Sequence, residues 1–258
     1  FVGKLLGATV LGFYQMAYKI SNMPATEITH VISQVTLPAY SKLQDDIPRL
    51  REAYLKVLQA TAFLSLPVAG LIFVLAPDFT RIFLGEKWMP MVPAMQIFCV
   101  LGVLRSIAAT SGPIFLATGR PDIEAKLPAA QLALLSILIY PLTAKWGITG
   151  TAISIVIVSC SFFFIILGIV VKLIKMERAD VMNLIKIISF PVLAIIPLIF
   201  TKIFILSPFI TNNIANFSMS IIISILLYLM GIYIIDRCSD YNMLKNITAT
   251  FSNLTGRG

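Results

Sequence analysis

The stretch Ile148–Val171, ITGTAISIVIVSCSFFFIILGIVV, decides the fold, because it is long enough to cross a bilayer and contains no charged residue. Six similar apolar stretches flank it, at about residues 10–40, 53–76, 92–117, 124–144, 187–206 and 217–235. Hydrophobic residues make up 58% of the chain and charged residues only 12%, whereas a soluble domain needs more charge to cover its surface. Barrel strands would be about 10 residues long and alternating in polarity. We therefore predict an all-α, polytopic membrane protein with about seven transmembrane helices.

The net charge of +8 follows membrane topology. Thirteen basic residues fall in the loops of one side, against five on the other, and Lys19 and Arg105 lie inside spans. The larger set is Lys42, Arg49, Arg51, Lys56, Arg120, Lys126, Lys172, Lys175, Arg178, Lys186, Arg237, Lys245 and Arg257. The positive-inside rule places that side and the C-terminus in the cytoplasm. Because no stacking aromatics or nucleic-acid motif accompany the basic residues, we expect no nucleic-acid partner.

Catalytic and metal chemistry find no support in the sequence. The single histidine lies inside a predicted span, and the outer loops are short. No nucleophile elbow, phosphate-binding loop, CxxC pair or zinc motif occurs. We therefore expect no enzyme activity, no catalytic residue, no cofactor and no metal site.

Two loops have clear local signals. The amphipathic segment 43–58 is capped by Asp45 or Asp46, and we expect it to lie in the cytoplasmic interface before the second span, with partner binding as the alternative. In the connection 119–124, Gly119 suits the left-handed end of a helix, and Asp122 can cap the next helix.

The first span carries polar residues that cannot face lipid. At about 100° per residue, every polar side chain between Lys19 and Gln34 except Ser21 falls within about 160° of arc. The candidate cavity stripe is Asn22, Thr26, Glu27, His30, Ser33 and Gln34, with Lys19 as a cation beside it. A charge at membrane depth costs at least about 2.5 kcal/mol, so the stripe faces a bundle interior or a water-filled path. An ion pair between Lys19 and Glu27 is the structural alternative.

Arg105 lies near the middle of the span 92–117, with small residues on its side. Its planar guanidinium can bind phosphate through two parallel hydrogen bonds, which lysine cannot do. We consider two roles for it: contact with an anionic substrate group, or a structural ion pair with Glu27 or with a helix C-terminus.

Five ordered motifs resemble those of bacterial polysaccharide flippases of the O-antigen, colanic-acid and teichuronic-acid type. They are LGFYQMAYKI at 11–20, MPATEI at 23–28, VTLPAYSKL at 35–43, LGEKW at 84–88 and LATGRP at 116–121. These flippases are exporters of the multidrug/oligosaccharidyl-lipid/polysaccharide superfamily. The resemblance extends over about residues 1–175, and the remainder agrees only in hydropathy.

The resemblance implies a two-lobe exporter of which this chain is the C-terminal half. Residues 1–9 would end a preceding helix and its outer loop, and 10–175 would form the lobe lining the cavity. Residues 176–236 would be two peripheral helices, and 237–258 a cytoplasmic tail. Such a protein would flip an undecaprenyl-diphosphate-linked oligosaccharide to the outer leaflet of the bacterial inner membrane by alternating access, driven by an ion gradient. Lys19 and Arg105 would bind the diphosphate, and Glu27 or His30 would carry a coupling proton.

Three alternatives remain open from the sequence: a cation-coupled drug exporter, a lipid II flippase, and a membrane scaffold of a polysaccharide assembly complex. Drug exporters of cations need more acids than bases in the cavity, whereas Lys19 and Arg105 outnumber Glu27 here. We expect the lipid-linked oligosaccharide and the bilayer as partners, a polysaccharide polymerase complex as a candidate partner, and a monomer.

Overall fold

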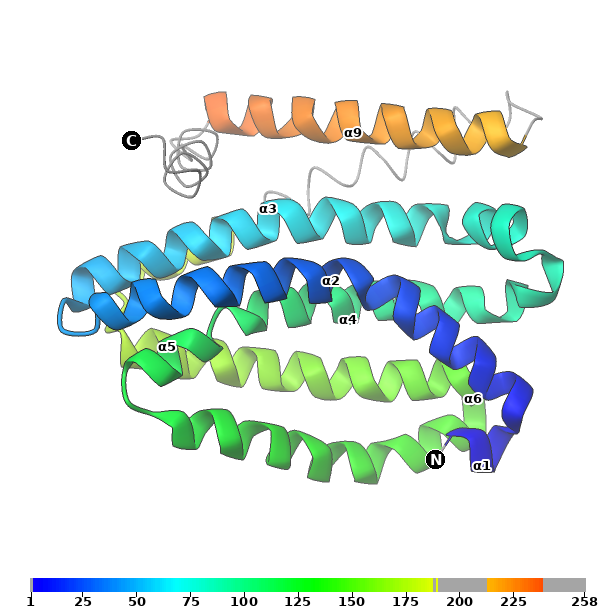
Figure 1. The fold of residues 1–258 in the computed structure, drawn as a ribbon, viewed down its shortest axis with the longest axis horizontal. Coiled ribbons are helices and arrows are strands. Elements are labelled where there is room, and N and C mark those ends of the chain that lie inside the picture. The colour runs from blue at the N-terminus through cyan, green and yellow to red at the C-terminus, as the bar shows by residue number, and fades with distance from the viewer. Residues whose placement is uncertain (1, 188, 190–212, 239–258) are drawn as a thin grey trace.

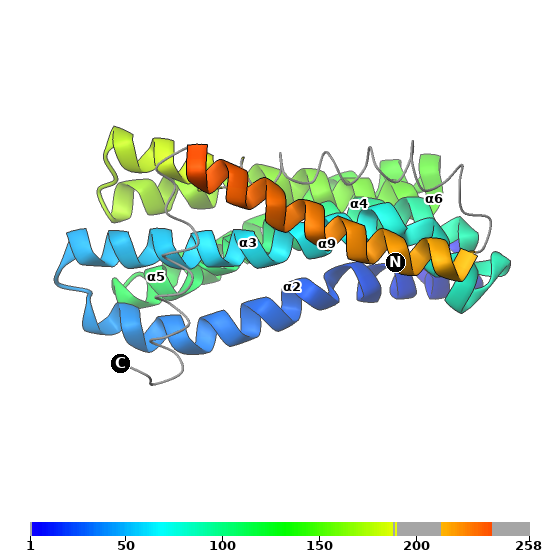
Figure 2. The same ribbon diagram turned by 90° about the horizontal axis from the view of Figure 1, so that it is seen from above.

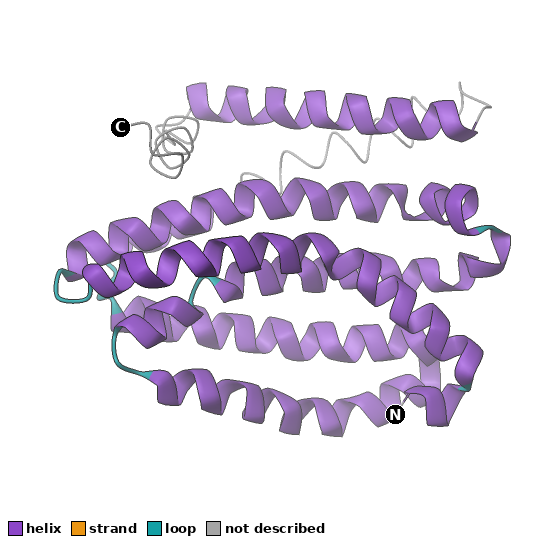
Figure 3. Cartoon of the chain, in the orientation of Figure 1, coloured by secondary structure: helices purple, strands orange, loops and turns teal. Residues whose placement is uncertain are grey.

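The computed structural model describes residues 2–187, 189 and 213–238, and all regular structure in this part is helical, as predicted (Figure 3). The α-helices are α1 (Val2–Leu6), α2 (Ala8–Lys42), α3 (Ile47–Phe79), α4 (Val92–Ala109), α5 (Gly112–Ala117), α6 (Pro121–Leu173) and α9 (Asn213–Cys238). A π-helix (Thr80–Leu84) and a 3-10 helix (Glu86–Met91) join α3 to α4, and residues 178–187 are also helical.

The long helices lie side by side in a bundle with α4 at its centre (Figures 1 and 2). Helix α4 packs against α2, α3 and α6, so it has helical neighbours on several sides. In the most apolar stretch of segment 86–117, which includes α4, 56% of the residues are buried. The corresponding stretches of the segments that contain α3 and α6 are each 39% buried. Arg105 thus belongs to the central helix of the bundle.

Three helical segments are long and apolar enough to cross a membrane: Ile47–Leu84, Glu86–Ala117 and Pro121–Leu173. Helix α6 reverses direction at Gly147, whose φ of 59° and ψ of −137° are compatible with glycine. The predicted spans 124–144 and 148–171 are its two arms (Figure 1).

The other predicted spans have mixed outcomes. The span 10–40 is helical within α2. Because of its polar stripe, α2 is not one of the three segments that are apolar enough to cross a membrane. The span 217–235 falls in α9, where Phe217–Gly231 is a shorter apolar stretch. Most of the span 187–206 lies outside the described residues. The number of seven transmembrane helices therefore stays a prediction.

The amphipathic segment 43–58, predicted as an interfacial lead-in to the second span, contains the turn before α3 and the first part of α3. Helix α3 begins at Ile47, capped by the Asp46 side chain, which accepts a hydrogen bond of 3.2 Å from the Arg49 amide. Leu50, Tyr54 and Leu58 are fully buried in the core. The apolar face of the segment thus packs on the bundle, and its position at the membrane interface stays a prediction.

The connection 119–124 was predicted correctly at Gly119, whose φ is +70°. Asp122 was wrongly predicted to cap α6. Helix α6 begins at Pro121, so Asp122 lies inside its first turn, where its carboxylate is 3.1 Å from Arg120 Nε and 3.7 Å from Lys126 Nζ.

The turns rich in basic residues gather at one end of the bundle. The α2–α3 turn, the α5–α6 turn and the end of α6 all lie there (Figure 1). Among the described residues, the segregation of basic loops expected from the sequence is therefore real in three dimensions. That this end is cytoplasmic stays a prediction.

Helix α9 packs against α3. The Tyr228 hydroxyl donates a hydrogen bond of 3.0 Å to the Phe63 carbonyl, and the two rings are 5.8 Å apart. Figure 1 shows α9 on the opposite side of α3 from the rest of the bundle. The division into a lobe at 10–175 and two peripheral helices at 176–236 stays a prediction, because part of it lies outside the described residues.

Candidate functional site

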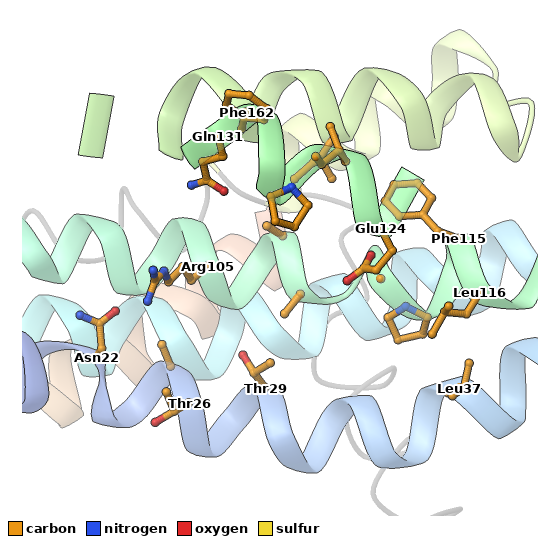
Figure 4. A pocket seen from close by; sticks show the side chains of 18 residues that line it. Asn22, Thr26, Thr29, Leu37, Arg105, Phe115, Leu116, Glu124, Gln131 and Phe162 are labelled. Atoms are coloured by element: carbon orange, nitrogen blue, oxygen red, sulfur yellow. The ribbon is translucent and has the colours of Figure 1, made fainter. Parts of the chain in front are cut away.

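A cavity of about 550 Å³ lies between α2, the end of α4, α5 and both arms of α6. Its walls are mainly apolar, with Leu37, Phe115, Leu116, Phe162 and Ile166 among the lining residues. The polar lining residues are Asn22, Thr26 and Thr29 from α2, Arg105 from α4, and Glu124 and Gln131 from α6 (Figure 4). A few polar groups in a mainly apolar wall are typical of a site that binds and orients a ligand.

Arg105 reaches this cavity from the central helix. Its side chain is exposed, and its Nη1 donates a hydrogen bond to the Tyr18 hydroxyl of α2. The guanidinium carbon is 5.6 Å from the centre of the Tyr18 ring. No carboxylate of the described residues forms an ion pair with Arg105, so the predicted structural alternative, a pair with Glu27, is absent from this structure.

A close approach of two helices sets the position of Arg105. A Cβ atom at Gly102 would lie 3.1 Å from the Ser21 carbonyl oxygen, so glycine allows α4 to approach α2 at this level. The Ser21 hydroxyl donates a hydrogen bond of 2.7 Å to the Met95 carbonyl across the same interface. Small residues at a membrane helix interface permit such backbone contact.

The cavity takes up only part of the predicted polar stripe of α2. Asn22 and Thr26 line it, together with Thr29, whereas Lys19, Glu27 and Gln34 do not. Lys19, Glu27 and Gln34 are exposed. The stripe is broader than one cavity wall, so its members point to two adjoining faces. The side chains of His30 and Ser33 lie outside what the structure describes.

The assignments of Lys19 and Arg105 as substrate-binding cations remain predictions, but the structure separates them. Only Arg105 lines the cavity. Glu124 also lines it, so the lining contains one basic and one acidic residue. The argument that cavity bases outnumber acids therefore loses its support among the described residues.

Sequence reasoning missed Glu124, Gln131 and the tyrosine that contacts Arg105. Glu124, Leu127, Pro128 and Gln131 recur at helical spacing and all line the cavity, so helical projection of this span would have grouped them. Tyr18 gave no comparable signal, because its role depends on the proximity of α2 and α4.

Glu124 occupies the space beside a glycine at the start of α5. Its two carboxylate oxygens would be 3.2 and 3.3 Å from a Cβ atom at Gly112. Figure 4 shows Glu124 toward the Phe115 and Leu116 side, with Arg105 nearer Asn22. The opposite charges therefore lie in different parts of the cavity. Within the described residues, no group of three His, Cys, Asp or Glu side chains could hold a metal ion.

Comparison with known proteins gives consistent matches. Residues 1–93 match the family described as "Polysaccharide biosynthesis protein". The lipopolysaccharide biosynthesis protein WzxC of Escherichia coli K12 is 34% identical over 125 residues, which is 48% of this chain and 25% of WzxC. The teichuronic acid biosynthesis protein TuaB of Bacillus subtilis 168 is 29% identical over 176 residues, 67% of this chain and 36% of TuaB.

Among solved structures, the lipid II flippase MurJ in an inward closed conformation has the same fold, with a TM-score of 0.69. The two proteins are 21% identical, and the match includes 88% of this chain and 47% of MurJ. The chain spans about a quarter to about a third of the length of the curated relatives described above.

Proposed function

We propose, on the premise that the chain belongs with the polysaccharide exporters of the multidrug/oligosaccharidyl-lipid/polysaccharide superfamily, that its protein flips an undecaprenyl-diphosphate-linked oligosaccharide across the membrane. The observation that carries the proposal is Arg105, a cation at the centre of an apolar bundle that projects into a cavity without a carboxylate partner among the described residues.

An anionic lipid headgroup needs such a group. A diphosphate loses hydration when it enters a low-dielectric layer, so a fixed cation must replace the lost water. The guanidinium presents a planar set of N–H donors that matches two phosphate oxygens at once. The acyl chain has no need of the cavity, because it is as apolar as the surrounding lipid.

The remaining polar lining suits a sugar. Thr26 and Thr29 offer hydroxyl groups. Gln131 offers a side-chain amide, whose Nε2 donates a hydrogen bond of 3.3 Å to the Ser159 hydroxyl. Hydroxyls and amides both donate and accept hydrogen bonds, as sugar hydroxyls require of their partners. The cavity thus combines one anion-binding group with several neutral polar groups.

The position of the cavity favours loading from the cytoplasmic leaflet. Leu37 and Glu124 line it and are close in sequence to the turns at the basic end of the bundle. The positive-inside rule assigns that end to the cytoplasm, which also places the C-terminus there. Alternating access would then expose the same groups to the outer side.

Ion coupling is part of the proposal. Glu27 and His30 remain candidate proton carriers from the sequence, and Glu124 joins them because its carboxylate lines the cavity. We also propose that the full-length protein is a monomer and that it contacts a polysaccharide polymerase complex.

The test uses cells that lack the full-length gene and follows which leaflet holds the lipid-linked repeat unit. Wild type should release repeat units from the cytoplasmic face, whereas Arg105→Gln should leave them trapped at normal expression. Arg120→Gln is the matched control, because it makes the same change in a loop outside the cavity lining. Export by Arg105→Gln at the wild-type rate would refute the role of the cation.

Glu124 also favours a second candidate, a cation-coupled drug exporter, because a cavity carboxylate can bind an organic cation. Efflux of ethidium by the full-length protein, lost in Glu124→Gln, would support that function over lipid flipping.

A further inference from the structure

We infer that Tyr18 is a positioning residue for Arg105, holding the guanidinium in the orientation in which it binds the phosphate of the transported lipid. The inference rests on the proposed function and adds to it a role for Tyr18, which lies within the motif at 11–20.

The contact between the two side chains is direct. Arg105 Nη1 donates a hydrogen bond to the Tyr18 hydroxyl, and the guanidinium carbon lies 5.6 Å from the ring centre. The hydroxyl and the ring therefore restrain the same arginine. An arginine side chain has several rotatable bonds, so a restraint at its end removes most of its freedom before a ligand arrives.

The tyrosine itself is held by aromatic packing. Its ring stacks on Tyr14 at 6.1 Å with an interplanar angle of 18°. It also meets the edge of Phe98, a fully buried residue of α4, at 5.4 Å and 84°. The close approach of α2 and α4 at Gly102 fixes the distance between the two backbones. Tyr18 is thus a rigid support, and Arg105 is oriented by it.

A phenol suits this task better than a carboxylate. It accepts a hydrogen bond from the guanidinium without carrying a negative charge, so the arginine keeps its full attraction for an anion. The guanidinium has five N–H donors, and one of them makes the hydrogen bond to the phenol oxygen. The others remain for a planar anionic group such as a phosphate.

A second observation marks the same corner of the cavity as a ligand site. Asn22 is only 3% exposed and lines the cavity, and its Nδ2 donates a hydrogen bond of 3.1 Å to the Tyr18 carbonyl. Its Oδ1 has no hydrogen-bond partner among the described residues. A buried acceptor without a donor is unfavourable, so a hydroxyl or N–H group of a ligand would satisfy it. Figure 4 shows Asn22 next to Arg105.

The experiment measures binding of undecaprenyl diphosphate to the full-length protein in nanodiscs, with uncharged undecaprenol as the comparison lipid. Tyr18→Phe keeps the ring and removes the hydroxyl. We expect it to raise the half-saturating concentration of undecaprenyl diphosphate about tenfold, as for the loss of a hydrogen bond to a charged group, and to leave undecaprenol binding unchanged. Tyr14→Phe is the matched control, because Tyr14 belongs to the same aromatic stack without a hydrogen bond to Arg105 among the described contacts.

A double-mutant cycle separates positioning from general packing. If Tyr18 acts through Arg105, the Tyr18→Phe change has no further effect in an Arg105→Gln background. An equal loss in both backgrounds, or equal losses for both lipids, would overturn the inference. Tight binding by Tyr18→Phe together with loss in Arg105→Gln would also overturn it and leave the proposed function intact. Wild-type binding by Arg105→Gln, or no binding by the wild type, would instead refute the proposed function.

Discussion

Replacement of Gly150 by alanine should destabilise the hairpin at which α6 reverses direction. Gly150 lies three residues after the reversal at Gly147, where the two arms of α6 are in direct backbone contact. A Cβ atom at Gly150 would be 2.5 Å from the Leu142 carbonyl carbon, nearer still to the carbonyl oxygen, and 3.2 Å from the Thr143 nitrogen. All three atoms are backbone atoms, so no side-chain rotation can relieve the contact.

The magnitude follows from the distances. Non-bonded carbon atoms are most stable at about 3.5–4.0 Å, so the arms must separate by about 1 Å. The hydrogen bond between the buried hydroxyls of Thr143 and Thr151 is 2.8 Å long, and the same displacement takes it beyond bonding distance. Loss of that bond costs about 1–3 kcal/mol, and the residual crowding costs about the same. Alanine recovers about 1 kcal/mol of helix propensity, which leaves a net loss of about 1–5 kcal/mol.

The assay is thermal unfolding in detergent, followed with a thiol-reactive fluorophore that reports exposure of the buried Cys99. The expected decrease in Tm for Gly150→Ala is roughly 2–20 °C. Gly168→Ala is the matched control, because it lies in the same helix and an added Cβ meets nothing within 4 Å. Equal Tm values for the two variants would refute the proposed backbone contact at Gly150.

Two further pairs of variants test the packing at the basic end. Tyr40→Phe should leave stability unchanged or raise it, because the buried Tyr40 hydroxyl has no partner among the described residues. Tyr54→Phe should cost about 1 kcal/mol, because the Tyr54 hydroxyl is 3.2 Å from the buried Ser111 hydroxyl. Urea unfolding of both proteins checks the order, and a larger loss in Tyr40→Phe would contradict it. Arg51→Gln should destabilise by about 2–3 kcal/mol, since Arg51 pairs with the largely buried Asp180 at 3.1 Å and also donates to a backbone carbonyl. Arg49→Gln, in an exposed pair, should cost less than about 0.5 kcal/mol, and similar Tm changes for the two arginine variants would exclude a special role for Arg51.

The candidate site could be predicted in part, because a helix has a fixed period. Projection of the first span grouped Asn22 and Thr26 correctly on one wall, and the mid-span position of Arg105 marked it as a residue for contact with an anion or for an ion pair. The same projection could not separate these residues from Lys19 and Glu27. An arc of about 160° on one helix can face two neighbours, and the sequence does not state which neighbour leaves a space.

The contacts between helices could not be predicted, because they depend on how the helices cross. The Tyr18–Arg105 pair joins residues 87 positions apart in the chain, and its geometry depends on the close approach at Gly102. Segment 43–58 is a second example: its apolar face has the same period whether it meets lipid or protein, so only the packed structure showed that Leu50, Tyr54 and Leu58 are buried in the core.

The sequence by itself determined that this is a helical membrane protein with its basic loops on one side, and its motifs resemble those of polysaccharide flippases. Composition and hydropathy are sufficient for this, because backbone hydrogen bonds in lipid must be satisfied within each helix. Only the tertiary structure decided which polar side chains share a cavity, that Glu124 faces it with Arg105, and that Tyr18 supports the arginine. The physical reason is that these properties depend on distances between helices, which are set by small residues and side-chain packing at each crossing.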